Sequence, residues 1–167
     1  MNRRQYLSAF LIAVASLATA TFVSCYQNTS FYQYHSTDIK GWERSDFLEY
    51  HVSPVSQKGY YVEEIGIRTA TTFPYRNLSL VVNQHVVSTT GQQTGRFRSD
   101  TVVVDIFDEN GRLLGQGANL KQYVIPFKSL KLEVGDSLSI RIHHNMKSIA
   151  VPGVSDVGVK LTYQYAE

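Results

Sequence analysis

The sequence is poor in cysteine and carries almost no excess charge. Only one cysteine, Cys25, occurs in 167 residues, so no disulfide can form within the chain. The chain has 16 Lys and Arg residues and 14 Asp and Glu residues. Two of the basic residues, Arg3 and Arg4, precede every acidic residue. The body that follows is therefore neutral. Binding to a phosphate backbone requires clustered Lys and Arg, so we expect no nucleic-acid partner.

Motifs for catalysis and for cofactors are also missing. The chain has no Gly-x-Ser-x-Gly elbow, and Gly111, Gly115 and Gly117 are followed by no Lys-Ser or Lys-Thr, which excludes a phosphate loop. Asp108-x-Asn110-Gly111 lacks the spacing and the closing Glu of a calcium loop and is better explained as a turn. The sequence therefore predicts no catalytic residue and no cofactor. A hydrolase that uses a pair of carboxylates is an alternative that the sequence does not exclude.

The histidines do not form a metal-ligand pattern. His143 and His144 are adjacent in an expected strand, and neighbouring strand residues point to opposite faces, so one metal cannot easily receive both rings. His35, His51 and His85 stand alone, without a second ligand at suitable spacing. We expect no metal site.

The first 24 residues have the layout of a secretory signal peptide. A basic segment, 1–5, precedes 18 uncharged residues, 6–23, which we expect to form the signal helix. A membrane span of minimal length is the alternative, but the serines, threonines and small alanines of this run make it a poor membrane anchor.

A lipid attachment site follows directly. Phe22-Val23-Ser24-Cys25 resembles the lipobox of bacterial lipoproteins, with Phe22 in place of the usual Leu. The resemblance implies that the Cys25 thiol forms a thioether to diacylglycerol and that Cys25 becomes the new N-terminus. The covalent lipid, with acyl chains such as palmitate, would hold the protein stably at a membrane without a spanning helix.

The chain divides into three parts by composition. We expect residues 1–24 to form the signal peptide, residues 25–39 the lipidated N-terminus and a polar tether whose later part can dock on the domain, and residues 40–167 the folded domain. No acidic cluster follows Cys25, and such clusters resemble the surface-export signal of Bacteroidetes lipoproteins. The absence of such a cluster favours a periplasm-facing protein of the cell envelope. The sequence does not distinguish between the inner and the outer membrane as the site of the lipid.

From about residue 40 the apolar residues recur with a period of two. Leu138, Ile140 and Ile142 alternate with polar residues, as in a strand with one buried face. We expect Thr101–Phe107 to be a central strand, joined to the next by a tight Asn110-Gly111 turn. The fold class predicted is all-β, a two-sheet antiparallel sandwich of jelly-roll type. The expected strands cover 48–52, 60–68, 78–87, 101–107, 113–127, 137–146 and 157–165. Asp105 lies among apolar residues, where a buried acid would need Arg68 or Arg76 as a partner.

Several motifs in this region resemble a known family. Their order and spacing are similar to those of the GldH family, the gliding-motility-associated lipoproteins of Bacteroidetes. The resemblance implies a non-enzymatic envelope lipoprotein needed for the gliding machinery, which is linked with type IX secretion. The motifs are Gly41-Trp42, Asp46-Phe47, Arg68, Phe73-Pro74-Tyr75-Arg76-Asn77-Leu78, 108–117, Gly135, Ile140, Ile142, Met146 and 153–158.

Exposed aromatic residues would support a different function. Most aromatic side chains of a sandwich pack in its core, but Trp42 and Tyr75 are the first candidates for a platform that stacks on sugar rings. Asp100-Thr101-Val102 and Asp136-Ser137-Leu138 resemble the acceptor pattern for O-glycosylation in Bacteroidetes, with Thr101 and Ser137 as acceptors. We therefore predict a lipid-anchored sandwich that acts by contact with other envelope proteins; the alternative is a carbohydrate-binding module.

Overall fold

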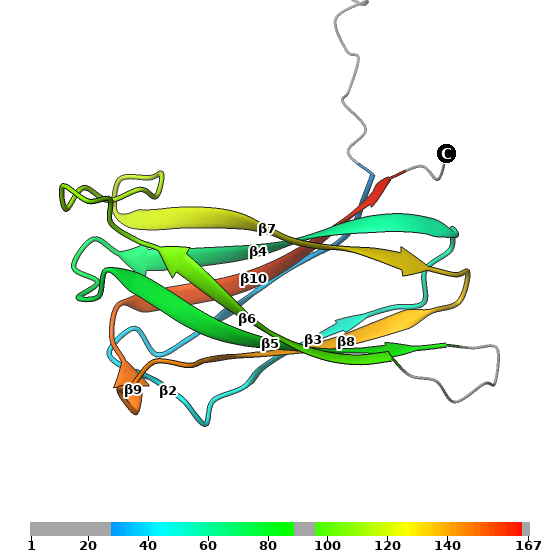
Figure 1. Cartoon of the computed structure of the whole chain (residues 1–167), viewed down its shortest axis with the longest axis horizontal. Coiled ribbons are helices and arrows are strands. Elements are labelled where there is room, and N and C mark those ends of the chain that lie inside the picture. Colours follow the sequence, from blue (N-terminus) through cyan, green and yellow to red (C-terminus); the bar gives the residue numbers. More distant parts are fainter. Residues whose placement is uncertain (1–27, 89–95, 165–167) are drawn as a thin grey trace, which may run out of the picture.

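The described part of the chain is built from strands. The structure is a computed structural model that describes residues 28–88 and 96–164, and within them no helix occurs. Ten strands follow one another along the chain (Figure 1). They are β1 (Thr29–Ser36), β2 (Trp42–Glu43), β3 (Leu48–Val52), β4 (Gly59–Ala70), β5 (Asn77–Val87), β6 (Arg96–Asp105), β7 (Leu120–Leu132), β8 (Ser137–His144), β9 (Ala150–Val151) and β10 (Val154–Gln164).

The eight long strands form two antiparallel sheets that face each other. One sheet has the order β1-β10-β4-β7 and the other β3-β8-β5-β6, while β2 and β9 make a separate small ladder. Except for the β5–β6 hairpin, each long strand leads to a strand of the opposite sheet. This is the strand order of an eight-stranded jelly roll, which confirms the predicted all-β sandwich.

The core lies between the sheets and follows the alternation of the sequence. Leu138, Ile140 and Ile142 of β8 are buried, and the polar residues between them face outward. On one side of the sandwich, the Tyr50 hydroxyl of β3 donates to the Val157 carbonyl of β10 at 2.8 Å. The His35 ring of β1 meets the Tyr50 ring edge-on, with centroids 4.8 Å apart. Aromatic packing thus closes this side.

Ordered structure begins earlier than the sequence pattern indicated. β1 lies inside the segment 25–39 that we expected to be a tether, and it pairs with β10 from Thr29 to Ser36. Tyr34 of β1 lies over Gly158 and Gly66 on the next two strands, where an added Cβ would come within 2.6 Å and 2.0 Å of Tyr34 atoms. The Arg68 guanidinium covers the same ring at 4.2 Å. Glycines far along the chain make room for β1, which no local pattern reveals.

The strand expected to be central is an edge strand. β6 is the last strand of its sheet, and Val103 within it is exposed. The turn before Gly111 is tight as predicted, since Asp108 Oδ1 accepts from the Asn110 and Arg112 amides and Gly111 has a φ of 75°. The turn does not join sheet neighbours, however, because β6 and β7 belong to opposite sheets.

The start of β1 and the end of β10 lie together at one end of the sandwich. The Tyr163 amide donates to the Asn28 carbonyl at 2.8 Å, so the start of β1 lies beside the end of β10 (Figure 1). We call this the termini end; it also carries the turns 53–58 and 133–136. The opposite end, which carries the loop 106–119, is the far end. The signal peptide and Cys25 lie outside the described residues, and no helix suited to crossing a membrane occurs among the residues described.

Candidate docking cleft at the sandwich edge

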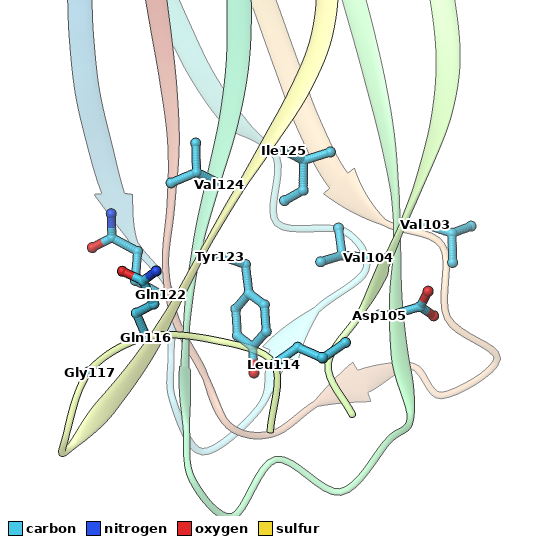
Figure 2. Close-up of a pocket in the computed structure, with 10 residues that line it drawn as sticks. All are labelled: Val103, Val104, Asp105, Leu114, Gln116, Gly117, Gln122, Tyr123, Val124 and Ile125. Carbon is cyan, nitrogen blue, oxygen red and sulfur yellow. The ribbon is translucent and has the colours of Figure 1, made fainter. Parts of the chain in front are cut away.

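An open cleft separates the two sheets where β6 and β7 run along the side of the sandwich. We call this side the β6–β7 seam. At its far end the cleft has a volume of about 680 Å³ (Figure 2). The residues that line it are Val103, Val104, Asp105, Leu114, Gln116, Gly117, Gln122, Tyr123, Val124 and Ile125. Its position is set by the edge strands and by the loop that connects them.

The cleft has an apolar floor and a rim that mixes apolar side chains with Asp105, Gln116 and Gln122. Tyr123 is buried, and its hydroxyl donates to the Ile106 carbonyl at 3.3 Å. Val103, Leu114 and Val124 stay 58%, 54% and 52% exposed at the rim. Within the described sheets, β6 pairs only with β5 and β7 only with β4, so each presents one edge without a partner strand, apart from Gln122 of β7, which bonds to Gln116 of the loop. An edge flanked by apolar side chains can accept an extended segment of another protein.

Two glycines shape the loop that forms one wall of the cleft. A Cβ on Gly115 would lie 2.6 Å from the Tyr123 ring, and Gly117 has a φ of 116° that other residues rarely adopt. The loop is held by two backbone hydrogen bonds between Gln116 and Gln122, of 3.0 Å and 2.7 Å. These glycines therefore serve a turn and a close approach.

Polar contacts close the seam towards the termini end. The Lys128 ammonium of β7 forms an ion pair with Asp100 of β6. The Arg96 guanidinium donates to the Lys131 carbonyl at 2.9 Å. The two sheets are thus linked here and open beyond.

A buried acid lies beneath these links and was not found from the sequence. Glu63 of β4 is fully buried and accepts a hydrogen bond from the Gln84 amide of β5. Burial raises the pKa of Glu63 to about 7, although the Gln84 hydrogen bond and the Lys128 charge act in the opposite direction. Neither Glu63 Oε1 nor Gln84 Oε1 accepts a hydrogen bond from another described group. A protonated Glu63 carboxyl would supply a hydrogen-bond donor at this place. Because it is enclosed, we assign Glu63 a structural role.

The aromatic residues suggested for sugar stacking are not an exposed platform. Trp42 is 1% exposed, its indole donates to the Asp46 carbonyl at 2.9 Å, and its ring meets His144 edge-on. Tyr75 is half-buried against Phe73. The structure therefore contradicts the proposal for Trp42, because sequence alone does not show which aromatic side chains face the core.

The other expected residues fall at separate places. His144 is buried while His143 contacts Phe47 on the outer face, so the two rings point apart as expected. Asp105 is exposed despite its apolar neighbours in the sequence, so it needs neither Arg68 nor Arg76 as a buried partner. Within residues 28–88 and 96–164, no three potential ligand residues gather around a metal position.

The suggested glycosylation acceptors differ in their exposure. Thr101 is exposed on the edge strand β6, whereas Ser137 is half-buried at the start of β8. The preceding Asp136 is buried, and its Oδ2 accepts from the Glu133 amide at 3.0 Å, which stabilises the turn. Modification at either position stays a prediction.

Fold and cleft together define a class: a small jelly-roll domain with an open cleft at the β6–β7 seam. The family model described as GldH lipoprotein matches residues 29–161, which spans the sandwich from β1 into β10. The chain belongs to the GldH lipoprotein family. It is accordingly a lipoprotein of the gliding-motility type, a membrane-anchored protein of the cell envelope.

Comparisons beyond the family add little. No curated protein matches the chain significantly. Among solved structures, the chain resembles the Eiger TNF from S. frugiperda, with 16% identity over 84% of this chain and 90% of that chain. The TM-score is 0.32, and this likeness carries no argument about function.

Proposed function

We propose that this protein is a non-enzymatic docking component of an envelope assembly associated with gliding and type IX secretion. It binds a partner protein through the cleft of the β6–β7 seam. The observation that supports this proposal is the exposed apolar side chains of Val103, Leu114 and Val124 beside two strand edges that have no partner strand beyond the Gln116–Gln122 bridge. Long exposed edges favour pairing with another chain, so a partner that covers this one would also protect it from aggregation.

The position of the lipid anchor orients the cleft. We propose that Cys25 carries the lipid and that the domain faces the periplasm. Only three peptide steps separate Cys25 from Asn28, a reach of about 10 Å when extended. The termini end would therefore stay close to the bilayer. The cleft, at the other end of strands such as the 11-residue β5, would be presented about 35 Å away.

Site-specific photo-crosslinking in the native strain tests the docking proposal. A photoreactive phenylalanine analogue replaces Leu114 in the cleft or, as a matched control, Ile149, which is 77% exposed in another far-end loop. We expect a reproducible crosslink to one envelope protein from position 114 and several-fold less of it from position 149. Equal crosslinking from both positions, or recovery of the monomer alone from position 114, would overturn the proposal.

A further inference from the structure

We propose that the termini end of the sandwich is itself a membrane-contacting surface that binds anionic lipid headgroups. This inference rests on the proposed anchoring through Cys25 and adds a second point of contact made by the folded domain. The surface is formed by Arg96, Arg98 and Lys131 together with the exposed side chains of Phe97 and Val134. We call these five residues the basal surface.

The topology brings the basal surface to the anchored end. Arg96 and Phe97 begin β6, and Lys131 lies near the end of β7. Register places Arg96 opposite Val86 on β5 and Lys131 opposite Tyr60 on β4, both at the termini end. Since the anchor can extend only about 10 Å beyond Asn28, a bilayer that holds the lipid lies near the termini end, where these residues stand on the edge strands opposite β1.

The charge of this surface suits an anionic membrane. A pocket of about 210 Å³ is lined by Arg96, Arg98 and Lys131 among others. Arg96 donates to the Lys131 carbonyl, and Arg98 makes no ion pair with any described residue. The guanidinium groups keep several donors for phosphate oxygens.

The acids at this end do not cancel that charge. Glu133 pairs with Lys58 at 3.0 Å, and Asp136 is buried within its own turn. The three cations of the basal surface therefore have no acidic partner among the described side chains of this end.

Exposed apolar side chains accompany the cations. Phe97 is 67% exposed and Val134 is 60% exposed, and Tyr60 and Val87 flank them with smaller exposed fractions. Aromatic and aliphatic side chains next to Arg and Lys are the combination that inserts at the boundary between headgroups and acyl chains. An isolated exposed Phe needs no explanation, but one beside unpaired cations at the anchored end fits a bilayer.

Tryptophan quenching in vesicles tests the inference with the full lipidated protein. Phe97→Trp places a reporter on the basal surface, and Val103→Trp places one on the same face of β6, about 20 Å further from the proposed bilayer. The native Trp42 is buried and gives a constant background. In phosphatidylcholine–phosphatidylglycerol vesicles with brominated acyl chains, we expect the reporter at 97 to be quenched several-fold more than the reporter at 103.

Charge-neutralising variants separate headgroup binding from simple proximity. Arg98→Gln with Lys131→Gln should reduce quenching of the reporter at 97, whereas Lys40→Gln with Lys147→Gln, an equal charge change at the far end, should not. In vesicles of phosphatidylcholine alone, the protein that keeps Arg98 and Lys131 should show the same reduction in quenching at position 97 as the Arg98→Gln, Lys131→Gln variant shows in anionic vesicles. Equal quenching in neutral and anionic vesicles would overturn the assignment to anionic headgroups.

Flotation with the vesicles distinguishes the two proposals. Protein that floats with vesicles but shows no difference between the two reporters overturns the membrane-contacting surface alone. Protein that does not float overturns the anchoring through Cys25 and this inference with it. Flotation with selective quenching at position 97 supports both.

Discussion

The β6–β7 seam has two halves that differ in how the sheets meet: a closed half towards the termini end and an open half towards the far end. Towards the termini end, Lys128–Asp100 and the Arg96 contact to β7 link the sheets, with the Glu63–Gln84 pair buried beneath them. Towards the far end, the sheets part and leave apolar side chains around an open cleft. One half thus contains polar groups that bond to each other, and the other half has exposed apolar side chains, together with Asp105, Gln116 and Gln122, around an open cleft.

This difference indicates where a partner can bind. A polar contact that is already made within the chain offers little to another protein, because breaking it leaves buried groups without partners. Exposed apolar side chains beside a free strand edge gain from being covered. The open half is therefore the better docking surface, and the closed half keeps the sheets together.

The largest effect should come from removing the floor of the open half. Tyr123→Ala takes away a buried aromatic ring and should lower the free energy of unfolding by about 3–5 kcal/mol. Val124→Ala, on the opposite face of β7, should change it by only about 0.5 kcal/mol. Urea unfolding measures both. Equal losses for the two variants would mean that the Tyr123 ring does not pack as part of the core.

An intermediate effect is expected in the closed half. The pKa of Glu63 is about 7 when folded, against an ordinary value of 4.5, so the folded protein keeps a proton that the unfolded chain releases within this window. Stability should therefore fall as the pH rises from about 4.5 to 7 and stay reduced above it. Glu63→Gln should remove this loss and stabilise the protein at pH 8 by about 1–3 kcal/mol.

Unfolding of both proteins at pH 5 and pH 8 checks this prediction. Glu64→Gln is the control, because Glu64 faces outward and pairs with Lys160 at 3.0 Å. The control should retain the pH dependence of the wild-type chain. A Glu63→Gln protein with unchanged pH dependence would show that the buried carboxyl titrates normally.

The smallest effect concerns the ion pair that closes the seam. A double-mutant cycle with Lys128→Met and Asp100→Asn should give a coupling of about 0.5–1 kcal/mol, since both side chains are partly exposed. The more exposed pair Lys58–Glu133 should couple more weakly and lose most of its coupling in 1 M salt. Stronger coupling in the exposed pair would contradict the view that Lys128 and Asp100 hold the sheets together.

Much of the fold could be predicted from local patterns. Strands β8 and β10 were found because one face alternates with the other over many residues, β5 was found from its apolar residues on both faces, and the tight turn was found from Asn110-Gly111. β1 was missed because its aromatic and polar residues show no clear alternation and its place depends on Gly66 and Gly158. The cleft itself had no sequence signal, since its walls come from β6, β7 and the loop between them.

The sequence by itself determined the class of the domain, the neutrality of its body and its family, because alternation, composition and motif order are properties of neighbouring residues. The tertiary structure decided which strands are edges, that Trp42 is buried, that Glu63 is enclosed and where the apolar cleft opens. These features depend on which strands pair and which faces meet across the core. Such contacts join segments far apart in the chain, and no local pattern records them.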